Sequence, residues 1–97
     1  MNLSTLSLNA AIQAAITDAR RRAGLTQRQL ARLLGRPPSW IAKIETGERR
    51  VMLLDAFDLS AGLGVTAAEL QALIDHHIRM QGLRATLAFM RRTEPVD

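Results

Sequence analysis

The sequence predicts an all-α fold, a single bundle of five to six helices, and three observations support this. Hydrophobic residues make up 47% of the chain and aromatic residues only 3%, so the helix formers Ala and Leu dominate its apolar part. Runs of β-branched residues, typical of strands, are absent. Apolar residues recur at helical spacing between short interruptions of glycine and proline. A chain of 97 residues has room for one hydrophobic core.

The first helix is predicted over residues 9–23. Ile12 and Ile16 fall on one face at helical spacing, and Gly24 follows as a left-handed C-terminal cap. The basic triplet at residues 20–22 falls in the last turn, where positive charge complements the helix dipole. These features together predict an amphipathic helix with a defined end.

Two short helices are predicted next. Thr26 and Gln29 have the spacing of a capping box, which predicts a second helix over residues 27–34. A glycine ends it, and two prolines form the connection because residues before proline disfavour helix. A third helix is predicted over residues 38–45, with proline at its first position. The inward positions are Leu30, Ala31 and Leu34 on the second helix, and Ile41 and Ile44 on the third.

Two further helices complete the prediction. A fourth is predicted over residues 53–63. A second capping-box pattern, Thr66 with Glu69, predicts the start of a fifth helix that continues to about Met90 and is weakened at Gly82. The inner face of the fourth helix is predicted to hold Leu53, Ala56, Phe57, Ser60 and Leu63.

Positive charge is concentrated in one part of the sequence. The net charge is +4, but residues 18–50 carry nine Arg and Lys against three Asp and Glu, a net charge of +6. Residues 51–78 carry a net charge of −4, and residues 79–97 one of +2. This asymmetry favours a surface that faces a polyanion over ordinary solvated charge.

The composition excludes several classes of protein. There is no cysteine, which excludes a disulfide framework and a cysteine-ligated zinc site. No nucleophile–base set and no glycine-rich phosphate loop is present, so we expect no enzymatic activity, no cofactor and no metal. Asp55 and Asp58, one turn apart, are interpreted as part of a solvated helix face. His76 and His77 would point about 100° apart on a helix, and we assign them to the surface or to an interface.

The N-terminal region does not have the pattern of a secretory signal. No basic residue precedes Asp18, and the polar Asn9 and Gln13 interrupt the apolar stretch. No segment approaches the roughly 18 to 20 apolar residues of a membrane span. We therefore expect a soluble, cytoplasmic protein that makes no membrane contact.

The second and third predicted helices, joined by a tight glycine-containing turn, have a helix-turn-helix arrangement. With Ile41 and Ile44 inward, the outer face of the third helix is small and polar. It holds Ser39, Ala42, Lys43 and Thr46. A helix of this kind fits the DNA major groove, where Lys43 can donate to guanine O6 and N7 and Ser39 can pair with several bases. Lys43 is the only lysine in the chain.

The stretch from Ala19 to Leu73 resembles the Cro/XRE-type helix-turn-helix domain of phage repressors and many bacterial regulators. The matching segments are Ala23-Gly24-Leu25-Thr26-Gln27, Leu30-Ala31, Leu34-Gly35, Ser39-Trp40-Ile41-Ala42-Lys43-Ile44-Glu45, Gly47-Glu48-Arg49 and Leu63-Gly64-Val65. The resemblance implies a repressor-like bundle that binds double-stranded DNA without a cofactor. It also implies a transcriptional regulator, expected to be a homodimeric repressor on an inverted-repeat operator.

The resemblance implies that Ser39, Ala42 and Lys43 face base edges. Pro38 falls at a position that commonly contacts a base, but proline has no donor to offer. The family usually has a serine-type cap where this chain has Pro37. Direct base readout is therefore expected to be sparse, with DNA shape contributing more of the specificity.

The resemblance also assigns residues around the third helix. Arg20 and Glu45 match a family pair that bridges the first and third helices and orients the latter. Trp40 stands at the groove margin, where it either contacts the sugar-phosphate backbone or completes the core. DNA backbone contacts are expected from Gln27, Arg28, Arg36, Trp40, Arg49 and Arg50. For the arginines, a solvated surface position is the alternative interpretation.

Residues 1–8 are predicted to form an N-terminal arm, residues 9–78 the DNA-binding domain, and residues 79–97 a C-terminal helical extension with a frayed tail. The predicted dimer interface consists of Leu73, Met80, Leu83, Leu87 and Met90, which follow a heptad pattern. The pattern is shorter than a coiled coil requires, so packing of this segment on its own core stays open. An alternative function is an antitoxin or anti-repressor whose C-terminal segment binds a partner protein.

Overall fold

The computed structural model describes the backbone of residues 5–93 and the surroundings of the side chains of residues 8–82 and 91. Its helices are α1 (Thr5–Arg22), α2 (Gln27–Leu33), α3 (Pro38–Thr46), α4 (Leu53–Leu63) and α5 (Ala67–Thr93). No strand occurs within residues 5–93, and the predicted all-α class is confirmed.

Most helix boundaries lie within a residue of the prediction, but α1 and α5 are longer than expected. α1 begins at Thr5 instead of Asn9, because no glycine or proline separates these two residues. Residues 5–8 therefore form the first turn of α1 and do not belong to an arm. α5 runs through Gly82 as one helix, since a single glycine in a helix costs only about 1 kcal/mol.

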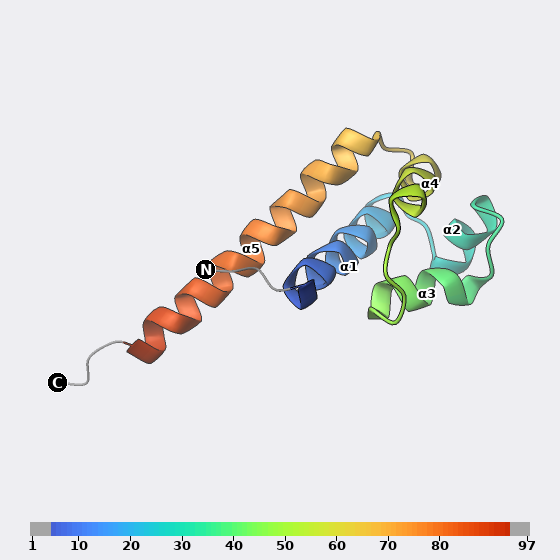
Figure 1. The fold of residues 1–97 in the computed structure, drawn as a ribbon. Coiled ribbons are helices and arrows are strands. Elements are labelled where there is room, and N and C mark those ends of the chain that lie inside the picture. The colour runs from blue at the N-terminus through green and yellow to red at the C-terminus, as the bar shows by residue number, and fades with distance from the viewer. Residues whose placement is uncertain (1–4, 94–97) are drawn as a thin grey trace.

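The two long helices lie side by side, and the short helices are packed at one end of the pair. In Figure 1, α1 and α5 run in opposite directions, and α5 continues past the first turn of α1. α2 and α3 pack on each other, and α4 contacts both α2 and α5. Neither α5 nor any other helix in the described part of the chain is long and apolar enough to cross a lipid bilayer.

The hydrophobic core lies where the inner faces of all five helices meet. Its largest fully buried side chains are Ile16, Leu30, Ile41, Ile44 and Leu59. Burying one such aliphatic side chain contributes about 1.5 to 3 kcal/mol. The inward positions predicted for the third helix, Ile41 and Ile44, are thereby confirmed.

Local hydrogen bonds determine where α2 and α5 begin. The backbone nitrogen of Thr26 donates to Oε1 of Gln29 at 2.9 Å, and the Gln29 nitrogen donates to Oγ1 of Thr26 at 3.0 Å. Thr66 and Glu69 form the same reciprocal pair at the start of α5. Both predicted capping boxes are confirmed. At the other end of a helix, α3 stops at Gly47, whose φ of 83° is the left-handed conformation of a C-terminal cap.

A glycine inside α4 allows α2 to pack closely against it. A Cβ atom at Gly62 would lie 2.8 Å from Cδ2 of Leu34 and 3.0 Å from Cδ1 of Leu30. These separations are shorter than van der Waals contact. Because Gly62 has no side chain, α2 of the helix-turn-helix can pack directly against α4.

The inner face of α4 differs from the prediction. Leu53 is 76% exposed and Phe57 54% exposed, although both were expected to be buried. Asp55, expected to lie on a solvated face, is 5% exposed. The reason is that the carboxylate of Asp55 has polar partners within the fold, so α4 turns this residue inward with Leu59 and leaves an apolar face outward.

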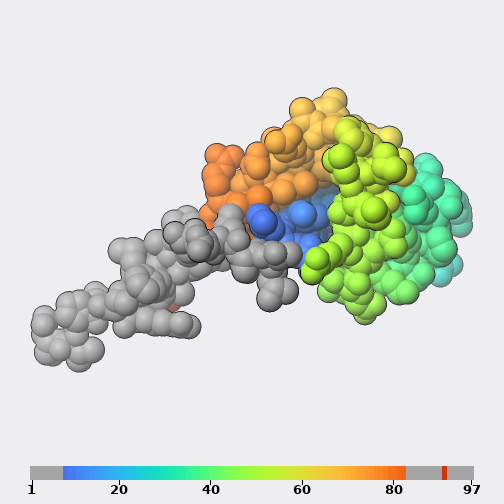
Figure 2. Space-filling view, in the orientation of Figure 1, coloured from blue at the N-terminus to red at the C-terminus, as the bar shows by residue number. Residues whose placement is uncertain are grey.

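The space-filling view shows the surroundings of this outward face. In Figure 2, the loop before α4 and α4 itself stand beside α5, with α1 visible between them. The hollow between these elements is lined by Ile12, Ile16, Val51, Met52, Leu53, Ala56, Leu59, Leu70 and Ile74. The apolar lining is therefore continuous with the core.

Candidate nucleic-acid interface

α3 is the element of the helix-turn-helix that turns a polar face to solvent. Ile41 and Ile44 anchor one side of the helix in the core. Ser39, Lys43 and Thr46 are exposed on the opposite side. The remaining predicted base-facing positions, Pro38 and Ala42, are exposed and half-buried respectively. The outer face therefore has the composition predicted for it, small and polar with a single cation.

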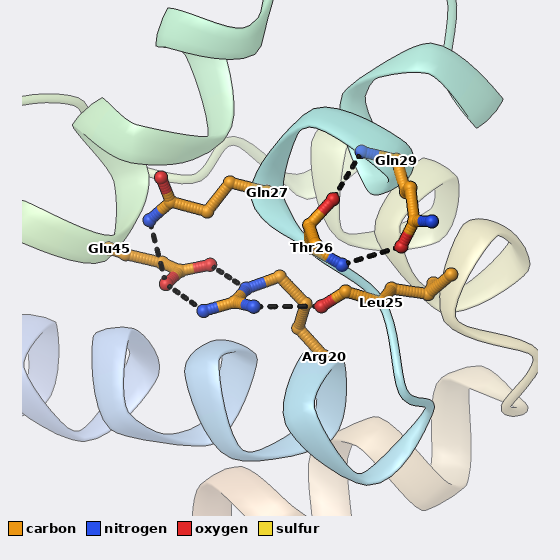
Figure 3. A network of polar contacts seen from close by, with 6 residues as sticks. All are labelled: Arg20, Leu25, Thr26, Gln27, Gln29 and Glu45. Atoms are coloured by element: carbon orange, nitrogen blue, oxygen red, sulfur yellow. Dashed lines mark hydrogen bonds and ion pairs between the residues drawn. The ribbon is translucent and has the colours of Figure 1, made fainter.

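A bidentate ion pair connects α3 to α1. The Nε and Nη2 atoms of Arg20 donate to the two carboxylate oxygens of Glu45 at 2.6 and 3.0 Å (Figure 3). Arg20 also donates through Nη1 to the backbone oxygen of Leu25, at 2.8 Å. Both partners of the ion pair are nearly buried. The expected bridge between the first and third helices is present, and it fixes the C-terminal half of α3 on α1.

The surroundings of Glu45 favour its charged form. Burial alone would raise the pKa of this carboxyl group. Hydrogen bonds from Arg20 and Gln27 and the charge of Arg20 outweigh burial, and the pKa of Glu45 lies below its ordinary value. The same hydrogen bond raises the pKa of Arg20. The pair is therefore ionised at neutral pH.

Gln27 belongs to this network, which the sequence did not reveal. Its Nε2 donates to Oε1 of Glu45 at 3.1 Å (Figure 3). The side chain was expected to contact a phosphate, but its amide donor is used inside the protein. A phosphate contact from Gln27 would have to replace this bond or share the donor group.

Trp40 lies in the core and not at an open groove margin. The residue is 7% exposed. The guanidinium carbon of Arg36 lies 4.6 Å from the centre of a Trp40 ring, and that of Arg49 lies 5.7 Å away, within cation–π range. Of the two interpretations left open by the sequence, the structure supports the core position. The predicted phosphate contact of Trp40 is corrected because its indole is covered by the protein.

Arg36 and Arg49 also approach one buried carboxylate. Nη2 of Arg36 lies 3.8 Å from Oδ1 of Asp55, and Nη2 of Arg49 lies 3.6 Å from Oδ2. Asp55 in turn accepts a hydrogen bond from the backbone nitrogen of Met52 at 3.1 Å. We call Arg36, Trp40, Arg49 and Asp55 the Trp40 cluster. The two arginines are thus neither free cations nor simply solvated.

The sequence analysis missed Asp55 as a member of the site. A local signal was present, because Asp55 is the third residue of α4 and can accept the N–H that precedes the helix. Its two cationic partners, Arg36 and Arg49, could not be recognised from local spacing. They lie in the turn before α3 and in the loop after it, and only the packing of α4 brings them together.

The other predicted backbone-contacting arginines remain at the surface. Arg28 and Arg50 are exposed, and neither has an ion pair within the described residues. Arg28 borders an open hollow beside the start of α3. Its lining is Arg28, Arg32, Gly35, Arg36 and Pro38. Three arginines and the exposed N-terminal end of α3 therefore form a basic surface next to the polar face.

The predicted dimer residues fall into two groups. Leu73 is half-buried and packs against the core, while Met80 is 38% exposed. The side chains of Leu83, Leu87 and Met90 lie outside the described residues. Part of the heptad pattern is therefore explained by the packing of α5 on its own bundle.

The two adjacent histidines differ in their surroundings. Nε2 of His77 lies 3.2 Å from Oδ2 of Asp18, which joins α5 to α1, whereas His76 is exposed. Burial raises the pKa of Asp18, but hydrogen bonds with His77 and Arg22 outweigh it and the pKa lies below its ordinary value. In the described part of the chain, no three His, Asp or Glu side chains group as metal ligands would.

Comparison with known proteins agrees with this geometry. The family model described as a helix-turn-helix domain matches residues 14–73. An XRE-family like protein from Pseudomonas syringae pv. tomato is 33% identical, with a TM-score of 0.65, over 71% of this chain and 84% of that one. The restriction-modification controller protein C.AhdI from Aeromonas hydrophila is 29% identical, with a TM-score of 0.60, over 64% and 94%.

A third structure is similar over nearly the whole fold. It is the clp gene regulator ClgR from Corynebacterium glutamicum, with a TM-score of 0.79 and 23% identity over 92% of this chain and 96% of that one. No curated protein matches the chain. Fold and site together define a helix-turn-helix domain with an extended last helix. The chain belongs to the Cro/XRE-type helix-turn-helix family, a family of DNA-binding regulators.

Proposed function

We propose that this protein is a homodimeric, sequence-specific transcriptional repressor that binds an inverted-repeat operator through α3. The orientation of α3 is the observation that carries the proposal. Two isoleucines hold the helix in the bundle, and the Arg20–Glu45 pair fixes its rotation. The polar face, with Ser39 and Lys43, is left exposed. A groove-binding helix needs this combination of a rigid support and an open, polar side.

Base recognition is assigned to a few residues of this face. Lys43 donates to a guanine in the major groove, and Ser39 and Ala42 lie against neighbouring base edges. Pro38 makes only apolar contact, because it has no donor. Because few donors reach the bases, the shape and deformability of the operator contribute a large share of the specificity.

DNA backbone contacts come from the surrounding basic side chains. Arg28 and Arg50 are exposed and need no rearrangement to contact phosphates. Arg36, Arg49 and Gln27 have partners in the protein and exchange or share them on binding. With several phosphates neutralised, the affinity is expected to fall steeply as the salt concentration rises.

Dimerisation would give the protein two copies of α3. One helix covers only a few base pairs, whereas a two-fold dimer places two of them on half-sites about 34 to 36 Å apart. We assign residues 9–78 to the DNA-binding domain and the part of α5 within residues 79–97 to self-association. Met80 is the exposed apolar residue at the start of that segment.

A second candidate function is an antitoxin or anti-repressor that also binds its own promoter. The outward apolar face of α4 favours it, since Leu53, Leu54 and Phe57 are exposed and offer a surface for a partner protein. A stable complex with the product of a neighbouring gene would support this candidate. A self-contained homodimer that forms no complex with the product of a neighbouring gene would contradict it.

Selection of bound sites from random double-stranded DNA tests the leading proposal. The expected result is an enriched inverted repeat, bound in the nanomolar range at physiological salt, with half-sites one DNA turn apart. Equal affinity for the enriched site and for a scrambled duplex would overturn the proposal of sequence-specific regulation.

A further inference from the structure

We propose that Asp55 is an internal counter-ion that competes with DNA phosphate for the guanidinium groups of Arg36 and Arg49, and thereby limits binding to non-operator DNA. This inference rests on the proposed function and deepens it by assigning a role in DNA affinity to a residue that has no DNA contact of its own. Asp55 acts through the two arginines as a positioning residue.

Two carboxylates lie on opposite flanks of α3, and they hold their arginines differently. On one flank, Glu45 accepts hydrogen bonds of 2.6 and 3.0 Å from Arg20. On the other, the carboxylate oxygens of Asp55 lie 3.8 Å from Nη2 of Arg36 and 3.6 Å from Nη2 of Arg49. A charge-assisted hydrogen bond usually measures about 2.7 to 2.9 Å, so both distances are longer. The first pair is a fixed connection, whereas the second is an attraction without tight hydrogen bonds.

The carboxylate of Asp55 stays in place while its partners can move. Asp55 is buried and tied to the backbone of Met52 at the start of α4. The side chains of Arg36 and Arg49 are 35% and 39% exposed, so part of each side chain reaches solvent. Among the side chains that the structure describes, only Arg36 has a further carboxylate nearby, Oδ2 of the exposed Asp58 at 3.5 Å. A phosphate can therefore approach both guanidinium groups from outside.

The Trp40 cluster also contains donors that the protein does not use. Within the described residues, the buried Nε of Arg49 and the buried Nε1 of Trp40 have no hydrogen-bond partner. Such atoms cost free energy unless a partner arrives. The cluster therefore has one guanidinium group, that of Arg49, and one indole whose donors are incompletely satisfied.

The consequence is a balance between an internal and an external anion. In non-operator DNA, a phosphate must compete with Asp55 for each arginine, which lowers the gain per contact. In the operator complex, base contacts by α3 hold the DNA backbone against the Trp40 cluster. This position favours the replacement of Asp55 by a phosphate as the partner of the arginines. Loss of the Asp55 charge should therefore strengthen binding to random-sequence DNA, and it also removes the cost of the exchange in the operator complex.

Asp55→Asn tests this inference, because asparagine keeps an oxygen that can accept from Met52 but removes the charge. Asp75→Asn is the matched control, since Asp75 is exposed on α5 and its substitution changes the net charge equally. In Asp55→Asn, we expect Arg36 and Arg49 to make one or two additional phosphate contacts with a random-sequence duplex. Each additional contact should raise the affinity about fivefold at about 0.15 M salt. The slope of log K against log salt should become steeper by about one to two. The control should change the affinity by less than about twofold.

Reversal of the effect identifies the arginines responsible. Adding Arg36→Gln and Arg49→Gln to Asp55→Asn should return the salt slope to the wild-type value or below. Equal slopes for Asp55→Asn and Asp75→Asn would overturn the inference. So would a steeper slope that persists without the two arginines. Elution from heparin, a sulfated polyanion, repeats the comparison without an operator, so a failure of the proposed function is distinguished from a failure of the inference.

Trp40 fluorescence of the wild-type protein tests the inference even if Asp55→Asn does not fold. Trp40 is the only tryptophan, and the chain contains no tyrosine, so its fluorescence reports on the cluster alone. Binding of the labelled operator duplex should shift the Trp40 emission as the guanidinium groups leave the indole. Binding seen in the anisotropy of the label without any change in Trp40 emission would contradict the exchange.

Discussion

Arg20 and Glu45 form a two-point connection across the bundle, with Nε and Nη2 of the arginine on the two carboxylate oxygens at 2.6 and 3.0 Å. One partner belongs to α1 and the other to α3, so the pair sets how α3 is rotated about its own axis. The bond from Arg20 to the oxygen of Leu25 extends the connection to the segment before α2. The helix proposed to contact DNA is therefore held by charge as well as by apolar packing.

Arg20→Ala is expected to destabilise the protein by about 2 to 4 kcal/mol, because it leaves a nearly buried Glu45 without its charged partner. Operator affinity should fall as well, since α3 loses its orientation. Denaturant unfolding measures the first effect and DNA titration the second. Arg22→Ala is the control: its side chain is 70% exposed and pairs with Asp18, so less than about 0.5 kcal/mol is expected. Equal losses for the two variants would contradict the assigned role.

The low pKa of Glu45 predicts acid sensitivity. A carboxyl group whose pKa is lower in the folded state contributes stability above its unfolded value of 4.5 and loses that contribution as the pH falls through the folded value. Wild-type protein should therefore lose more stability than Glu45→Gln as the pH falls from about 5 toward 3. Urea unfolding at a series of pH values gives the difference. Parallel curves for the two proteins would show that the pair does not stabilise the ionised form.

Lys43→Ala is expected to weaken operator binding by about 1 to 3 kcal/mol and to relax the preference at one base pair in each half-site. Stability should be unchanged, because the side chain is exposed. Competition with operators substituted at single positions measures the effect. Arg79→Ala removes one exposed positive charge on α5 and controls for net charge. A uniform loss at every position would assign Lys43 to a phosphate instead of a base.

Met80→Asp is expected to weaken self-association, because it places a charge at the exposed start of the proposed dimer segment. Met52→Asp makes the same change at an exposed methionine before α4 and should leave the dimer intact. Sedimentation equilibrium of both variants and the wild type provides the comparison. Dissociation by Met52→Asp alone would place the interface on the outward face of α4 and refute the assignment to α5.

The helices could be predicted from sequence because the information that determines them is local. Thr26 with Gln29 and Thr66 with Glu69 satisfy each other's backbone groups within one turn, so their pattern is visible without any tertiary structure. Ile41 and Ile44 follow from helical spacing, and α3 was correctly oriented for the same reason. The Arg20–Glu45 pair came from the family resemblance, since nothing in the spacing of the two residues indicates contact.

The features that were mispredicted depend on packing between distant segments. The buried Asp55 pairs with residues of two other segments, and apolar Leu53 and Phe57 are exposed as a consequence of the rotation this imposes on α4. The hydrophobic pattern alone places Ser60 and Leu63 on the inner face correctly, but it also places Leu53 and Phe57 there. Trp40 was ambiguous because an indole suits a groove margin and a core equally well, and the guanidinium groups that cover it come from the flanking turn and loop.

The central claim, that the polar face of α3 lies in the DNA groove, can be tested with a tethered cleavage reagent. The chain has no cysteine, so Ser39→Cys provides a single attachment point, and Asp75→Cys on α5 provides a control. With an iron chelate on each, the account predicts cuts inside both half-sites of the selected operator from position 39 and none there from position 75. Cutting from position 75 but not from position 39 would contradict it.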